Sequence, residues 1–109
     1  MTNEDVRVTR EASRIVIAVE GEIDIANVDG VEAKVRAAID PHSQIVIDLS
    51  ATQYLDSAAL RVLFSLAKTL GDRLRIVVPE ASPLRKVVTM VGLPEVVPVL
   101  SELPGPETG

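Results

Sequence analysis

The chain has 109 residues, enough for one domain with a single core. Hydrophobic residues make up 47% of it but aromatic residues only 2%, which favours an aliphatic core of buried parallel strands covered by helices. The sequence has no Cys, which excludes disulfides and thiol chemistry, and its single His excludes a histidine-rich site. A net charge of −5 without clustered Lys or Arg argues against nucleic acid as a partner.

The first forty residues predict a hairpin followed by a helix. Residues 5–10 (DVRVTR) alternate apolar and polar side chains, as half-buried strands do, and residues 14–20 (RIVIAVE) form the apolar run of a central strand. Over residues 26–39 apolar side chains recur at helical spacing, and Asp24 or Asn27 can cap this helix. The expected core positions of the helix are Val28, Val31, Val35, Ala38 and Ile39.

The centre of the chain predicts a second strand and a second helix. Residues 44–50 (QIVIDLS) are a short apolar run between polar ends, which is typical of a strand buried on both faces. The helix predicted over residues 57–70 stops before Gly71, a residue typical of helix C-termini. We expect its core face to consist of Leu60, Leu63, Phe64, Ala67 and Leu70.

The last third predicts one more strand, a helix and an edge strand. Residues 74–79 (LRIVVP) form the strand, and residues 82–92 the helix, with Ser82 as N-cap and Gly92 as C-cap. Its expected core face is Leu84, Val87, Val88 and Val91. Residues 95–100 (EVVPVL) contain Pro98, which cannot donate to a ladder, so this strand should lie at an edge. We expect residues 104–109 to be disordered.

The predicted order is β-β-α-β-α-β-α-β. Strands that alternate with helices need right-handed crossovers, which give a parallel sheet. We therefore expect a single α/β domain over residues 1–103, with a mixed, mostly parallel sheet, an N-terminal β-hairpin and covering helices. No run approaches the 18 apolar residues of a membrane-spanning helix and the start resembles no signal peptide, so we expect a cytoplasmic protein.

Polar residues gather where the strands are predicted to end. The functional crevice of an α/β sheet lies beyond the carboxyl ends of its parallel strands, here residues 21–24 (GEID), 50–60 (SATQYLDSAAL) and, more weakly, 79–83 (PEASP). Asp56 and Ser57 stand at a helix N-terminus, which favours a carboxylate or a phosphorylated hydroxyl. Asp and Ser are also the preferred N-cap residues, so a purely structural role is the simpler explanation from composition alone.

Catalytic motifs are missing from the sequence. It contains no Gly-rich phosphate loop, no GxSxG elbow and no spaced carboxylate cluster, so we expect no enzymatic activity, no catalytic residue, no metal and no cofactor. His42 stands beside a proline in DPHSQ, and we expect it to be a solvated loop residue rather than a ligand or base.

Residues 45–63 (IVIDLSATQYLDSAALRVL) resemble the hallmark of STAS domains, the family that includes bacterial anti-sigma factor antagonists. Residues 19–27 (VEGEIDIAN) are similar to the family's first conserved loop, and residues 84–99 (LRKVVTMVGLPEVVPV) to its third helix and last strand. The resemblance implies a STAS-like domain that binds an anti-sigma factor of the serine kinase type and so releases a sigma factor.

The resemblance also implies a phosphorylation switch, from which this sequence departs. In those switches the acceptor directly follows the Asp-Ser pair, and here that position is Ala58, which has no oxygen to modify. Either Ser57 accepts the phosphate, or the domain binds its partner constitutively. We favour constitutive binding, because the neighbouring hydroxyl points about 100° away around a helix. The expected partner-binding residues are Asp24, Asn27, Asp56, Ser57, Ala58, Leu60 and Arg61.

A second function remains open at this point. STAS domains also occur as small accessory subunits of lipid-trafficking ABC transporters, where a D-S-A-G-L motif is usual, and DSAAL at residues 56–60 is similar to it. An enzyme is supported only by analogy at the level of the fold. The sequence leaves open whether the domain is a monomer or a dimer.

Overall fold

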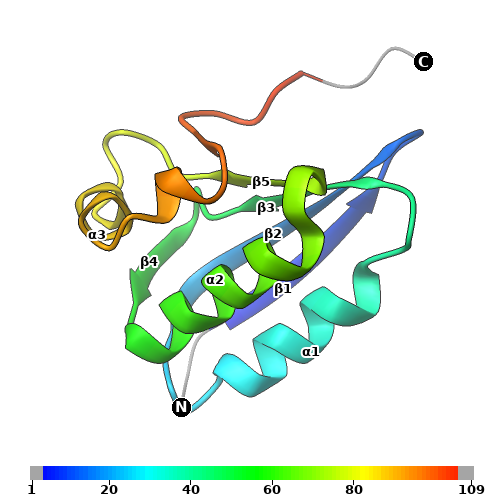
Figure 1. Cartoon of the computed structure of the whole chain (residues 1–109). Coiled ribbons are helices and arrows are strands. Elements are labelled where there is room, and N and C mark those ends of the chain that lie inside the picture. Colours follow the sequence, from blue (N-terminus) through cyan, green and yellow to red (C-terminus); the bar gives the residue numbers. More distant parts are fainter. Residues whose placement is uncertain (1–3, 106–109) are drawn as a thin grey trace.

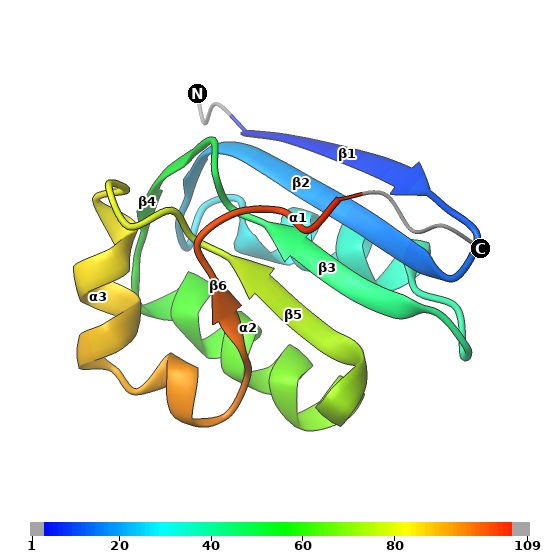
Figure 2. The same cartoon turned by 90° about the horizontal axis from the view of Figure 1, so that it is seen from above.

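The computed structural model describes residues 4–105 (Figure 1). Its elements, in chain order, are β1 (Glu4–Arg10), β2 (Arg14–Ile23), α1 (Val28–Ala38), β3 (Gln44–Asp48), β4 (Thr52–Leu55), α2 (Ser57–Leu70), η1 (Gly71–Arg73), β5 (Leu74–Val77), α3 (Leu84–Met90), η2 (Leu93–Glu95) and β6 (Val99–Leu100). Helices α1 and α2 lie on one face of the sheet, and α3 lies next to β4. The segment that follows β6 crosses the opposite face, as seen in Figure 2.

The sheet has the mixed topology expected from the sequence. Its strand order is β1-β2-β3-β5-β6, and β4 pairs with β2 outside this path. Strands β1 and β2 form the antiparallel hairpin, and the remaining pairs are parallel. Strand β6 pairs only with β5 among the described strands, which confirms its edge position. The α/β fold class and the N-terminal hairpin are therefore confirmed.

The central strands are buried on both faces because their residues are almost entirely aliphatic. The side chains that pack against the helices include Ile15, Ile17, Ile45, Ile47, Leu74 and Ile76. On the opposite face a smaller cluster consists of Val16, Val46 and Val77, with Leu100 packed against it. Full burial of each large side chain stabilises the fold by about 1.5–3 kcal/mol. These two clusters hold the sheet that positions the site.

The buried Arg14 ties the start of β2 to the C-terminal segment. Its guanidinium binds the Glu11 carboxylate at 2.8 Å and donates to the Pro104 carbonyl at 3.1 Å. Pro104 belongs to the tail that the sequence predicts to be disordered, and its carbonyl is bound by a buried cation. Residues 106–109 of that expected tail lie outside the described residues.

Strand β4 is a correction to the predicted element order. Residues 52–55 were expected to be loop, but they run parallel to β2 at residues 21–23, beyond the end of β3. Strand β2 has ten residues and β3 only five, so β3 leaves part of the edge of β2 unpaired. Strand β4 occupies that part, and the buried Thr52 hydroxyl donates to the Val19 carbonyl at 2.6 Å.

Two predicted helix faces also need correction. In α2, Leu60 and Phe64 are only half-buried, whereas Leu66 is 1% exposed. The buried residues of α2 are Ala59, Leu63, Leu66, Ala67 and Leu70. In the third predicted helix Val91 is 44% exposed, because the α-helix ends at Met90 and a 3₁₀ turn follows Gly92. The buried face of α2 thus differs from the simple periodic pattern, and the pattern in the third helix stops where the α-helix ends.

The ends of the third helix and of the last strand differ from prediction as well. Helix α3 starts at Leu84, although the Ser82 hydroxyl still accepts a hydrogen bond from the Leu84 N–H at 3.1 Å. Gly92 has φ of +81°, a conformation that glycine adopts without strain. The last strand is only Val99–Leu100, because residues 93–95 form the 3₁₀ turn η2.

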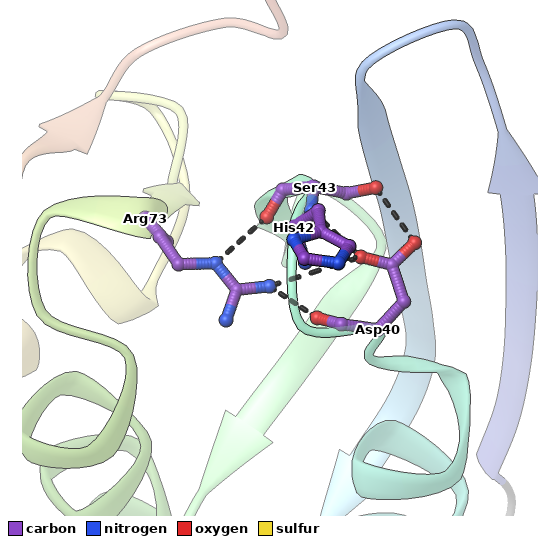
Figure 3. Close-up of polar contacts among 4 residues, drawn as sticks. All are labelled: Asp40, His42, Ser43 and Arg73. Atoms are coloured by element: carbon purple, nitrogen blue, oxygen red, sulfur yellow. Dashed lines mark hydrogen bonds and ion pairs between the residues drawn. The ribbon is translucent and has the colours of Figure 1, made fainter.

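A polar cluster fastens the α1–β3 loop to the start of β5 (Figure 3). The Asp40 carboxylate accepts hydrogen bonds from the Ser43 N–H at 2.7 Å, the Ser43 hydroxyl at 2.8 Å and the His42 N–H at 2.9 Å. The Arg73 guanidinium donates to the Ser43 and Asp40 carbonyls and lies 3.9 Å from the Asp40 carboxylate. The His42 side chain is exposed, as the sequence predicts.

These donors stabilise the charged form of Asp40. The Ser43 N–H contributes most, followed by the Ser43 hydroxyl, the His42 N–H and the Arg73 cation, and together they lower the pKa of Asp40 from 3.8 to about 2. A carboxyl whose pKa is lower in the folded state adds stability above its unfolded pKa and loses it as the pH falls through its folded pKa. The contribution of Asp40 should therefore disappear as the pH falls from 3.8 to about 2.

We expect Asp40→Asn to lower the free energy of unfolding at neutral pH, because the amide accepts fewer and weaker hydrogen bonds than the carboxylate. The variant should also lose less stability than the wild type when the pH is lowered from 3.8 toward 2. Urea unfolding across this pH range measures both effects. Asp29→Asn, at an exposed position of α1, is the control. Identical pH dependence in Asp40→Asn and the wild type would contradict the assignment.

Candidate functional site

Asp56 connects the start of α2 to the loop that follows β2. It is the N-cap residue, and one carboxylate oxygen accepts a hydrogen bond from the Ala59 N–H at 3.0 Å. The other oxygen accepts from the Ile25 N–H at 2.8 Å, and the Asp56 N–H donates to the Ile23 carbonyl. The expected capping role of Asp56 is confirmed, and the same carboxylate fixes a second loop.

The β2–α1 loop is held from within by Asp24 and Asn27. The Asp24 carboxylate accepts a hydrogen bond from the Ala26 N–H, and the Asp24 N–H donates to the Asn27 side chain, both at 2.9 Å. The Asn27 amide also donates to the Glu22 carbonyl at 2.8 Å. Asn27 occupies the N-cap position of α1, but no side-chain hydrogen bond from it caps the helix. Both side chains therefore shape the loop rather than the helix end.

An open groove of about 530 Å³ runs between the first halves of α1 and α2. Its lining residues are Ile25, Val28, Asp29, Glu32, Ala58, Arg61, Val62 and Ser65. Ile25 is 79% exposed, although it stands in a loop whose backbone is held by hydrogen bonds. Asp29 and Glu32 come from α1, where the Arg36 guanidinium binds the Glu32 carboxylate at 2.8 Å, and Arg61 comes from α2. The groove therefore combines apolar residues with unlike charges on its two helices.

The predicted site residues lie in the β2–α1 loop and at the start of α2, around the groove, and they differ in exposure. Ser57 and Arg61 are exposed, and Ala58 is half-buried at the side of the groove. Asn27 is only 7% exposed, so its side chain offers almost no surface to a partner. Leu60 is half-buried and packs against the core rather than lining the groove. Direct contact of Asn27 and Leu60 with a partner stays a prediction, and the structure gives both side chains little exposed surface.

Ile25 was not among the predicted site residues, although it is the most exposed large hydrophobic of the described chain. No local signal separates it from a core isoleucine, since it stands between Asp24 and Ala26 directly after the end of a strand. Glu32, Val62 and Ser65 were also missed, because only the packing of α1 against α2 brings them to one groove.

A second hollow of about 430 Å³ lies at the carboxyl ends of β3 and β5. It is lined by Glu20 and by residues from 50–53 and 79–83. These two ranges belong to the segments that the sequence predicts to follow the parallel strands at residues 50–60 and 79–83. Among residues 4–105 there is no group of three or more His, Asp or Glu side chains placed to hold a metal ion. In the same residues no helix is both long and apolar enough to cross a membrane.

Comparison with known proteins places this geometry in a family. The model of the STAS domain matches residues 5–103. Anti-sigma-F factor antagonist RsfB of Mycobacterium tuberculosis is 29% identical over 96 residues, which cover 86% of this chain and 79% of RsfB. BtrV of Bordetella bronchiseptica, to which the role of anti-sigma factor antagonist is assigned provisionally, is 31% identical over 88 residues, or 78% of this chain and 76% of BtrV.

A solved structure has the same architecture. The crystal structure of an anti-sigma factor antagonist from Mycobacterium paratuberculosis superposes with a TM-score of 0.84 at 27% identity. The superposition covers 93% of this chain and 88% of that one. The likeness therefore extends over most of the chain.

We expect Asp56→Ala to lower the free energy of unfolding by about 1–2 kcal/mol, because α2 loses its cap. The β2–α1 loop should loosen as well, since the Ile25 N–H loses its acceptor. Thermal unfolding measures the first effect, and hydrogen exchange at the Ile25 amide the second. Ser57→Ala, one residue away and exposed, is the control and should leave both unchanged. Unchanged exchange at Ile25 in Asp56→Ala would contradict the connection between the loops.

Proposed function

The chain belongs to the STAS domain family, and from this premise we propose that it is an anti-sigma factor antagonist, which binds an anti-sigma factor and so releases a sigma factor. The named relatives support this function over that of a transporter subunit, because RsfB, BtrV and the protein from Mycobacterium paratuberculosis are all named as antagonists of this kind. We take the partner to be an anti-sigma factor of the serine kinase type, which the family resemblance implies. Binding, rather than catalysis, is the proposed activity, and the cytoplasm the proposed location.

The observation that carries the proposal is the exposed Ile25 at the edge of the α1–α2 groove. An apolar side chain on a fixed backbone can fill a pocket of a partner with little loss of conformational entropy, which is typical of interface hot spots. The Asp56 carboxylate fixes the Ile25 backbone at 2.8 Å before any partner arrives. The proposed contact residues are Ile25, Ser57, Ala58 and Arg61, and the residues that hold them in place are Asp24, Asn27, Asp56 and Leu60.

The charges at the groove define what the partner should offer. Asp29 lies on the α1 side and Arg61 on the α2 side, whereas Glu32 on α1 is already paired with Arg36 at 2.8 Å, so a complementary surface carries a cation opposite Asp29 and an acid opposite Arg61. An apolar pocket between them would receive Ile25. Charges at the rim mainly set the association rate and orientation, whereas the buried apolar anchor supplies most of the affinity.

We further propose that binding is constitutive. Ala58 lies at the side of the groove, at the position where the family resemblance implies a phosphate acceptor, and an alanine cannot be phosphorylated. The exposed Ser57 hydroxyl is one position earlier, and consecutive helical residues point about 100° apart. A kinase site shaped for the family position would therefore meet this hydroxyl poorly, and the antagonist would be controlled through its amount.

We expect Ile25→Ala to weaken binding of the cognate anti-sigma factor by about 2 kcal/mol, or about thirtyfold in Kd, because the partner pocket is left unfilled. Stability should not change, since Ile25 is 79% exposed. Titration calorimetry measures the affinity. Met90→Ala on α3, at a residue that is 75% exposed outside the groove, is the matched control. Equal effects of the two substitutions would rule out the proposed surface.

We expect the wild type to gain no phosphate when incubated with the cognate anti-sigma factor and ATP, whereas Ala58→Ser becomes phosphorylated. The modified variant should bind more weakly, because an added charge of about −1.5 to −2 must be desolvated in the interface. Mass spectrometry and calorimetry measure the two steps. Ala58→Ser combined with Ser57→Ala should behave like Ala58→Ser alone. Stoichiometric phosphate on wild-type Ser57 would instead establish that the acceptor has shifted by one residue.

A further inference from the structure

Strand β1 forms an edge of the sheet that lies outside the proposed docking surface. It pairs with β2 along its whole length and with no other described strand, as seen in Figure 2. Such an edge presents a row of backbone N–H and C=O groups that can pair with another strand. At seven residues, β1 is longer than β4 and β6, which have four and two residues and also pair with one described strand each.

The hairpin register tells which residues of β1 direct their backbone groups outward. The Glu11 N–H donates to the Arg14 carbonyl, so residues 11 and 14 form a hydrogen-bonded pair. Hydrogen-bonded and non-hydrogen-bonded pairs alternate along an antiparallel ladder. Asp5, Arg7 and Thr9 therefore direct their backbone groups toward β2. The backbone groups of the even-numbered residues point away from the sheet; these residues are Glu4, Val6, Val8 and Arg10.

The sequence of this edge is complementary to itself. Beside a second copy that runs antiparallel and is centred on Arg7, Glu4 falls opposite Arg10 of the second copy and Val6 opposite its Val8. The four residues whose backbone groups point outward then lie opposite residues with complementary side chains. Unlike charges meet at both ends of the pairing, and apolar side chains meet between them. Val8, which is 41% exposed, would be covered. Sliding the register by two residues in either direction separates Glu4 from Arg10.

The centre of this arrangement is also electrostatically tolerable. Arg7 would lie opposite Arg7 of the second copy, which alone would be unfavourable. Each Arg7 guanidinium, however, already binds the Asp5 carboxylate at 3.3 Å and the Glu20 carboxylate at 3.1 Å. The two cations therefore meet with acids on either side, and Glu4, Asp5, Arg7 and Arg10 together leave the strand without net charge.

From this complementarity we infer that β1 is a homodimer interface, at which two copies join their sheets edge to edge about a two-fold axis at Arg7. An axis perpendicular to the sheet reverses the strand direction in the second copy. The carboxyl end of β2, where the β2–α1 loop lies, then points in opposite directions in the two copies. The dimer leaves both α1–α2 grooves open, so its formation is independent of the proposed function.

Sedimentation equilibrium of the full chain, from micromolar to near-millimolar concentration, tests this interface without any partner protein. We expect a reversible dimer in the wild type and a monomer for Val8→Pro. Proline at this outward-facing position removes an N–H needed by the second copy and none needed by β2. Val8→Ala keeps that N–H and should still dimerise. A wild type that is monomeric throughout, or a dimer unaffected by Val8→Pro, would overturn the inference.

A charge exchange tests the register itself. Glu4→Arg and Arg10→Glu should each weaken the dimer about tenfold, because each places like charges opposite one another at both ends of the pairing. The double variant Glu4→Arg with Arg10→Glu restores unlike pairs and should regain the wild-type dissociation constant. Both positions lie at the ends of an edge strand, and circular dichroism checks that the fold is retained. A double variant as weak as the single ones would refute the register centred on Arg7.

Discussion

The arrangement of the site depends on one carboxylate that satisfies two backbone segments at once. The two oxygens of Asp56 accept hydrogen bonds from Ala59 at the start of α2 and from Ile25 in the β2–α1 loop. A helix start and a loop that are distant in sequence are thereby joined by charge-assisted hydrogen bonds to one carboxylate, next to the pairing of β4 with β2. The same carboxylate therefore caps α2 and holds the loop that carries Ile25. A structural role of Asp56 as a cap is thus compatible with a functional role at the docking surface.

Most of the fold could be predicted from runs of aliphatic residues. The elements that depend on contacts between distant parts of the chain could not. Strands β2, β3 and β5 were predictable because both of their faces carry buried aliphatic side chains, such as Ile47 on one face of β3 and Val46 on the other. Strand β4 was not, since its four residues form a strand only because β3 ends early and leaves β2 unpaired. The face of α2 was predicted in part: Leu63 and Leu70 are buried, but Leu66 replaces Phe64 once the helix packs against its neighbours.

The residues of the candidate site could be predicted where local hydrogen bonding sets their role. They could not be predicted where their role depends on solvent exposure in the folded chain. Asp56 caps α2 as the preferences of helix starts predict, whereas Asp24, expected as a possible cap of α1, instead accepts a hydrogen bond from Ala26 within the loop. The identity of the surface as a docking site came from the family resemblance rather than from residue spacing. Ile25 escaped prediction because nothing local distinguishes an isoleucine that points outward from one that points into the core. The burial of Asn27 was equally hard to foresee, since a polar amide can be buried when backbone partners satisfy its hydrogen bonds.

The segment after β6 has a practical consequence for measuring association. It runs over the face of the sheet opposite α1 and α2, with the Pro104 carbonyl bound by Arg14 and Leu103 39% exposed. The chain contains no cysteine. Leu103→Cys would therefore introduce a unique thiol for a fluorophore on the face away from the groove, and the dye could report rotational diffusion while the α1–α2 surface remains unmodified.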